Sequence, residues 1–160
     1  MINDFFYKYN EKKEIYNNEV FAALVIYNVI KKMNTIELTK ALLIMPFISH
    51  KQTMKFLKNE NTRINGIEEF IVKKPRFFLN FNDRYYSLLT VSLNSIMLLA
   101  ELEVVSIEND WLLVNEMKPM DITLENCGER IFDVTKAIDK LSKLLNEKKE
   151  NLYLQLRVEL

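Results

Sequence analysis

The segment LLIMPFISHKQT (Leu42–Thr53) joins a dense apolar run to a proline and to the chain's only histidine. Apolar residues recur at helical spacing after a cap at Thr35, and Pro46 should end or kink that helix because proline cannot donate a backbone hydrogen bond. Ser49 and Gln52 then have the S-x-x-Q spacing of a capping box, which marks the start of a new helix. The segment therefore predicts a junction between two helices.

His50 lies at this predicted junction and has two interpretations. Its side chain titrates near neutrality, which would suit a general base. In the first turn of a helix capped by Ser49, the same ring would instead make a structural hydrogen bond or contact a partner. No serine or cysteine in the sequence has the local pattern of a nucleophile. We therefore favour the structural or interface role and expect no catalytic residue.

Helical spacing of apolar residues also predicts elements on both sides of the junction. The segment from Val20 to Lys32 follows an acidic first-turn residue and is apolar on nearly every side, which places it in the core. Pro75 suits the first turn of one helix, and Thr90 suits the cap of another. The further helices expected on this basis are Ile67–Val72, Pro75–Ser87 and Val91–Glu101.

The segment LEVVSIENDWLLV (Leu102–Val114) contains two β-rich runs separated by Glu108–Asp110 and predicts a β-hairpin. Two helices followed by a hairpin is the order of a winged helix-turn-helix unit. The outer face of a recognition helix should offer Arg, Lys, Asn or Gln to the bases. Val91–Glu101 offers Asn94 and no basic residue, so this helix is better suited to burial or to protein contact.

Two further patterns lie near the end of the sequence. An apolar stripe at spacings of three and four predicts a long amphipathic helix; its residues are Ile131, Val134, Ile138, Leu141 and Leu145. Apolar and polar residues then alternate from Leu152 to Leu160, which favours a terminal strand, although a last helical turn before Arg157 is an alternative. We expect a mainly α (α+β) fold: a compact helical domain with a winged-helix-like unit, a small hairpin and a long C-terminal helix. It forms one domain, 1–160, with a helical core over 17–101, a hairpin wing over about 102–116, and a C-terminal helix and tail over about 127–160.

The composition agrees with one helical domain. Hydrophobic residues make up 49% of the 160 residues, whereas only 2 glycines and 3 prolines are available for tight turns. Lys+Arg and Asp+Glu number 22 each, so the basic excess of a dedicated nucleic-acid binder is missing. The single cysteine rules out an internal disulfide and suits a reducing compartment.

The sequence also argues against secretion and membrane insertion. Its first residues lack the basic and apolar regions of a signal peptide. The longest apolar runs, Val20–Tyr27 and Ala41–Ile48, are far shorter than the ~18 residues that a membrane span needs. We therefore expect a soluble, cytoplasmic protein.

Nucleotide and metal sites lack their usual ligands in this sequence. Gly66 and Gly128 are its only glycines, too few for a phosphate-binding loop. One histidine and one cysteine lack metal-ligand spacing. We therefore expect no cofactor and no metal. Lys73 and Lys74, beside Arg76, could contact phosphates, although ordinary surface lysines explain them equally well.

The order of these segments resembles the middle component of bacterial three-component ABC-ATPase systems, the group that includes Lamassu-type anti-phage defence. The resemblance covers nearly the whole chain. It rests on Asn17–Ile30, on LLIMPFISHKQTMKFL (Leu42–Leu57), which is similar to the family's LP..LHK.TR segment, on Phe81 and Arg84 within Asn80–Val105, and on Lys136–Leu160. The chain departs from the family at Met54, where Arg is usual, and at Glu101, where a glycine often ends the helix.

The resemblance implies a non-enzymatic adaptor that bridges an SMC/Rad50-like ABC ATPase, which senses DNA, and an effector, often a nuclease. DNA would then be contacted through the complex. The alternative hypothesis is a winged-helix DNA-binding regulator. The motif positions make His50, Lys51 and Arg84 candidate interface residues, together with Trp111 of the hairpin. A tryptophan on a short hairpin is nevertheless more often a side chain that fills the core than a binding hot spot.

Overall fold

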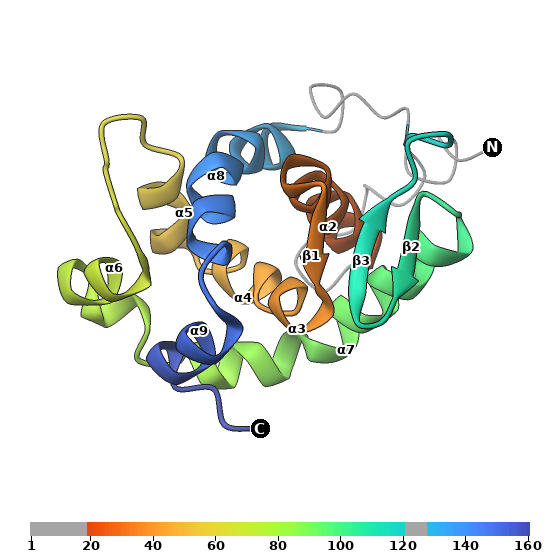
Figure 1. The fold of residues 1–160 in the computed structure, drawn as a ribbon. Helices are drawn as coiled ribbons and strands as arrows, with labels where there is room; N and C mark the ends of the chain where they lie inside the picture. The colour runs from red at the N-terminus through yellow and green to blue at the C-terminus, as the bar shows by residue number, and fades with distance from the viewer. Residues whose placement is uncertain (1–18, 121–127) are drawn as a thin grey trace.

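The structure, a computed structural model, describes residues 19–120 and 128–160. It is mostly helical with a small sheet, as the sequence predicts (Figure 1). In chain order the elements are α2 (Glu19–Met33), β1 (Thr35–Glu37), α3 (Leu38–Ala41), α4 (Ile44–Ile48), α5 (Lys51–Leu57), α6 (Ile67–Lys73), the 3₁₀ helix η2 (Pro75–Phe77), α7 (Phe81–Glu101), β2 (Val105–Glu108), β3 (Trp111–Val114), α8 (Glu129–Leu145) and α9 (Lys149–Leu156). Across these residues, no helix combines the length and the apolar character that crossing a bilayer requires.

Helix α2 is the central element of the fold. Its residues Val20–Tyr27, Val29 and Ile30 are all buried, because apolar side chains cover every side of the helix. It packs against α4, α7 and α8, which surround it in Figure 1. The prediction that this segment belongs to the core is confirmed.

Three short strands form an antiparallel sheet in the order β1-β3-β2. Ile36 and Leu112 are opposite each other in the register, and both are buried against the core. Asn109 and Asp110 have positive φ angles of 48° and 67°, as the type I′ turn of a two-residue hairpin requires. The predicted hairpin is confirmed, with Asn and Asp in the left-handed conformation that glycine usually takes.

The segment around the predicted junction folds in shorter pieces than expected. Thr35 does not cap a helix; it begins β1, because Thr35–Glu37 pairs with β3. The apolar run then divides into α3 and α4. Pro46 lies inside the first turn of α4, where a missing amide hydrogen removes no intrahelical bond. The prediction that Pro46 ends or kinks a helix is therefore wrong.

One long helix replaces the two helices predicted between Pro75 and Glu101. Pro75 begins only the 3₁₀ helix η2, and α7 then continues without a break through Thr90. Buried side chains recur along α7 at helical spacing; they are Phe81, Tyr85, Leu88, Ser92, Ser95, Ile96 and Leu99. This stripe outweighs the weak preference of threonine for a cap. The winged-helix interpretation, which needed a turn at Thr90, is not confirmed.

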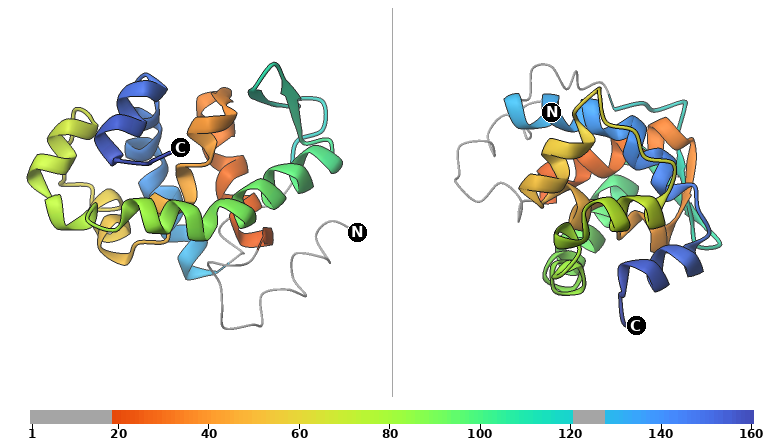
Figure 2. Two further views of the ribbon diagram at one scale, coloured as in Figure 1. Left: turned by 90° about the horizontal axis from the view of Figure 1, so that it is seen from below. Right: turned by 90° about the vertical axis from the view of Figure 1, so that its left-hand side faces the viewer.

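Helix α7 runs along one side of the molecule and connects its two ends (Figures 1 and 2). The helices α5 and α6 and the 3₁₀ helix η2 lie towards one end, and the hairpin lies at the other. A helix of 21 residues is about 30 Å long at 1.5 Å per residue.

The two C-terminal helices include one confirmed prediction and one correction. The stripe predicted for α8 is buried. The tail, however, is helix α9 and not the expected strand. Leu152, Tyr153 and Leu156 are buried whereas Leu154 is 73% exposed, so the alternation in the sequence does not correspond to a buried face. α9 ends at Leu156, and its C-cap residue, Arg157, has a left-handed φ of 54°.

Candidate functional site

His50 is the N-cap residue of α5. Its backbone is extended, with φ −86° and ψ 110°, and its ring Nδ1 accepts a hydrogen bond of 3.3 Å from the amide of Thr53. The Thr53 hydroxyl lies 2.8 Å from the same nitrogen. Ser49 has a helical backbone and closes α4 instead, so the predicted capping box of Ser49 and Gln52 is wrong. The cap is one residue later, on the histidine.

The surroundings of His50 favour its neutral form. The ring is half-buried and meets the edge of Phe77 at 5.7 Å between centroids. Burial lowers the pKa of His50 below its ordinary value of 6.5, and the positive charge of Arg84 lowers this pKa further. A neutral ring keeps the Nδ1 lone pair that the Thr53 amide needs. The geometry thus gives His50 a structural role at the helix junction.

Arg84 holds the other side of this junction together. Its Nε donates to the carbonyl of Pro46 at 3.2 Å, one terminal nitrogen donates to the carbonyl of Phe77 at 2.9 Å, and the other donates to the side chain of Asn80. The guanidinium also lies 5.2 Å from the ring centroid of Phe81. Burial lowers its pKa to about 10. Arg84 therefore connects α4, η2 and the start of α7.

A cluster of phenylalanines surrounds His50 and Arg84. Phe56 stacks on Phe70 at 4.8 Å, Phe70 meets Phe78 edge-on at 5.0 Å, and Phe47 meets Phe81 at 4.9 Å. Six of the ten phenylalanines lie between positions 47 and 81, and this density was a signal that the sequence interpretation missed. The cluster fixes the positions of Phe56 and Phe77 at the surface.

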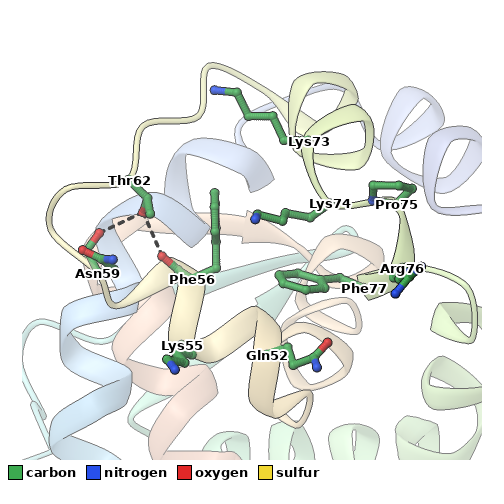
Figure 3. Close-up of a pocket in the computed structure, with 10 residues that line it drawn as sticks. All are labelled: Gln52, Lys55, Phe56, Asn59, Thr62, Lys73, Lys74, Pro75, Arg76 and Phe77. Atoms are coloured by element: carbon green, nitrogen blue, oxygen red, sulfur yellow. Dashed lines mark hydrogen bonds between the residues drawn. The ribbon is translucent and has the colours of Figure 1, made fainter.

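A basic hollow of about 700 Å³ opens beside this cluster (Figure 3). Its charged lining residues are Lys55, Lys73, Lys74 and Arg76, and none of the described carboxylates lines it. Lys74 extends between Phe56 and Phe77 in Figure 3, with its Nζ 5.7 Å and 6.0 Å from the two ring centroids. The hollow thus combines positive charge with aromatic walls.

Lys73 and Lys74 have different surroundings, although the sequence suggested the same role for both. Lys73 donates to the carboxylate of Glu69 and to the carbonyl of Arg63. The hydrogen bond from Lys73 is the main reason why the pKa of Glu69 is lowered. Within the described part of the chain, Lys74 has no carboxylate at ion-pair distance and contacts the two rings instead. Phosphate contact by either lysine stays a prediction.

Lys51 lines a second hollow, of about 390 Å³, on the other side of α5. Lys55 and Arg130 line it too, as does Lys58, which forms an ion pair of 2.6 Å with Asp133. Lys51 itself is exposed. Because Lys55 lines both hollows, they adjoin each other across α5.

Trp111 lies at the other end of the molecule and is separate from these residues. It is 44% exposed, and the neighbouring Leu112 is the residue of β3 that is fully buried. Trp111 lies between Glu37 and Glu108 in the register of the sheet, on the face opposite Leu112. The interpretation of Trp111 as a side chain buried in the core is therefore wrong. The structure brings together His50, Lys51, Arg84, Lys73 and Lys74, but not Trp111.

Side chains that commonly ligate metals are scattered over the described structure. In residues 19–120 and 128–160, no three side chains of His, Cys, Asp or Glu are grouped so that they could hold a metal ion. Cys127 lies outside the described residues.

Comparison with known proteins identifies the family of the chain. No match was found among curated proteins or among solved structures. A family model described as ABC-three component (ABC-3C) system Middle Component 3 matches residues 7–160. This match spans nearly the entire sequence and agrees with the resemblance to a middle component. The chain therefore belongs to the Middle Component 3 family of ABC-three component systems.

Proposed function

We propose that this chain is a non-catalytic adaptor that bridges an SMC/Rad50-like ABC ATPase, which senses DNA, and an effector such as a nuclease, in Lamassu-type anti-phage defence. The observation that carries the proposal is the family match over residues 7–160. A middle component of a three-component ABC system implies an ABC ATPase and an effector as partners. The cytoplasm is where such a complex would meet phage DNA.

The arrangement of the molecule supports a bridging role. Arg84 belongs to the first turn of α7, and the hairpin of β2 and β3, which carries Trp111, lies at the other end of this helix (Figures 1 and 2). An adaptor needs two surfaces that two partners can occupy at once, and a helix about 30 Å long separates these two. Trp111 and Ile107, which are 44% and 47% exposed, are anchors of the kind found at interfaces.

The winged-helix regulator is less well supported. A wing that contacts DNA needs cations for the phosphates. Glu103, Glu108, Asp110 and Glu116 are instead exposed on and beside the hairpin, and Lys118 there is paired with Glu103. We therefore do not propose this alternative.

Co-purification tests the adaptor function. The tagged chain, expressed together with an ABC ATPase and an effector of the same three-component system, should retain both partners on an affinity column. The substitution Trp111→Ser should release one partner and keep the other, because it changes one end only. Leu154→Ser is the matched control, since Leu154 is an exposed apolar residue on α9. A chain that retains neither partner would contradict the proposal, and equal retention by Trp111→Ser would exclude Trp111 from the interface.

A further inference from the structure

The charges of the chain are separated between the two ends of α7, although they cancel overall. The segment Lys51–Arg76 contains seven basic and three acidic residues, whereas Glu101–Met120, which includes the hairpin, contains five acidic residues and one basic residue. Although the net charge is zero, the end of the molecule that contains Lys51–Arg76 has an excess of basic residues, and we call it the basic end. The electrostatic potential at that end attracts anions.

Several cations at the basic end are available to a ligand. Within the described residues, Lys51, Lys55, Lys74 and Arg76 have no carboxylate at ion-pair distance. Lys51, Lys55 and Arg76 are exposed, and Lys74 is half-buried. Each can approach an anion without first breaking an ion pair.

These four cations line two adjoining hollows. Lys74 and Arg76 line the hollow of about 700 Å³, Lys51 lines the hollow of about 390 Å³, and Lys55 lines both. The carboxylate that lines the smaller hollow, Asp133, is paired with Lys58. The two hollows meet at Lys55 on α5, and together they offer cations at four positions, which is more than one phosphate group requires. A ligand with charge at regular intervals fits it better than a single small anion.

The wall of the larger hollow adds groups that recognise a base. Phe56 and Phe77 line it, and they are held in place by the phenylalanine cluster. Gln52 and Asn59 also line this hollow and carry side-chain amide groups. A cationic groove with aromatic side chains is the combination by which proteins bind single strands without sequence preference.

We propose that the two hollows form one binding track for single-stranded nucleic acid, in which Lys51, Lys55, Lys74 and Arg76 contact phosphates and Phe56 and Phe77 contact bases. A single strand supplies one charge per nucleotide along the whole track and also supplies flat bases. An acidic protein segment would supply charge but no rings at each step. This track is at the opposite end from the hairpin, so it lies apart from the adaptor surface at Trp111 and shares its end of α7 with the surface at the junction of His50 and Arg84.

Fluorescence anisotropy with the full-length chain and a labelled oligothymidylate of about 20 nucleotides tests the track. Binding should weaken with salt, by about 0.7 log units in affinity per log unit of salt for each phosphate contact. The triple variant Lys55→Gln/Lys74→Gln/Arg76→Gln should bind at least about tenfold more weakly and lose about two units of this slope. The matched control Lys31→Gln/Lys143→Gln/Lys148→Gln removes the same charge from exposed positions that line neither hollow, and it should keep both affinity and slope.

Further variants and ligands separate strand binding from a folding defect and from simple charge attraction. The variant Lys55→Arg/Lys74→Arg keeps the charge and should bind as the wild type does, which shows that the loss is not a folding defect. An abasic oligomer of equal length should bind more weakly by about fivefold or more if bases stack on the rings. Three results would overturn the proposal. The control triple variant could lose as much affinity as the test variant, or the abasic oligomer could bind as tightly as the oligothymidylate. Thymidine monophosphate could also compete as well, per phosphate, as the oligothymidylate does. Tighter binding of an oligoglutamate peptide of equal length would overturn it too, and would assign the track to an acidic protein segment.

Discussion

At the scale of single residues, adjacent polar side chains compete for one structural role. Ser49 is the better N-cap by intrinsic preference, yet its backbone is already helical because it closes α4. His50 is the first residue with an extended backbone and therefore caps α5. The sequence could locate this junction within one residue, but it could not assign the cap, since that depends on where the preceding helix ends.

Substitutions at the two positions distinguish these roles. His50→Ala should lower the free energy of unfolding by about 1 kcal/mol, as loss of an N-cap does, and His50→Asn should restore most of it. Ser49→Ala should change it by less than about 0.5 kcal/mol, because the buried Ser49 hydroxyl has no hydrogen-bond partner in the described structure. Urea denaturation measures both. A larger loss from Ser49→Ala than from His50→Ala would restore the original capping-box prediction.

The lowered pKa of His50 predicts a dependence of stability on pH. Burial and the charge of Arg84 place the folded pKa below the ordinary 6.5, so the unfolded chain binds more protons at mildly acid pH. The stabilisation is present above pH 6.5 and is lost as the pH falls through the folded pKa. The urea midpoint of the wild type should therefore fall more between about pH 7.5 and about pH 5.5 than that of His50→Asn.

Other titrating groups do not obscure this difference. Within residues 19–120 and 128–160, the carboxylates whose pKa the fold lowers are Glu37, Glu69 and Glu103, and all three titrate below 4.5. Arg84, with its pKa of about 10, stays charged throughout the window. Equal pH dependence in the wild type and in His50→Asn would show that the ring is not buried against Arg84 in solution.

At the scale of elements, the secondary structure was predicted correctly where the pattern of apolar residues fits only one type of element. The all-round apolar α2 and the striped α8 could be predicted because only a helix buries those side chains. The hairpin could be predicted from its two β-rich runs. The tail was ambiguous, because Leu152 and Leu156 satisfy both a period of two and a helical spacing of four. Tyr153 packs against α7 and α3: its hydroxyl lies beside that of Tyr85 and donates to the carbonyl of Thr39. These contacts favour the helix over the strand.

Two alanine substitutions test the helical tail. In a strand, Leu152 and Leu154 would share one face and cost similar amounts when truncated. In α9, Leu152 is fully buried and Leu154 is 73% exposed. Leu152→Ala should therefore cost about 3 kcal/mol of unfolding free energy, and Leu154→Ala less than about 0.5 kcal/mol. Similar losses in chemical denaturation would favour the strand.

At the scale of the whole molecule, the candidate site depends on contacts that no local pattern reveals. His50, Arg84 and the basic hollow meet around Phe77, which lies 27 positions from His50 in the sequence. The resemblance to a middle component identified His50 and Arg84, but it could not show that both hold the wall of a hollow. Net charge was equally uninformative, because opposite charges cancel in a sum and separate only when the chain folds.

The separation of charge predicts how the acidic end affects binding at the basic end. The two ends are about 30 Å apart, whereas the Debye length is about 8 Å at 150 mM salt and about 30 Å at 10 mM. The variant Glu101→Gln/Glu108→Gln/Glu116→Gln should therefore change the affinity for the labelled oligothymidylate by less than about twofold at 150 mM salt. At 10 mM it should bind more tightly and associate faster, because a repulsive field has been removed. Anisotropy and stopped-flow fluorescence measure the two effects. An equal gain at both salt concentrations would mean that the acidic residues contact the strand directly, and that the track extends beyond α5 and η2 towards the hairpin.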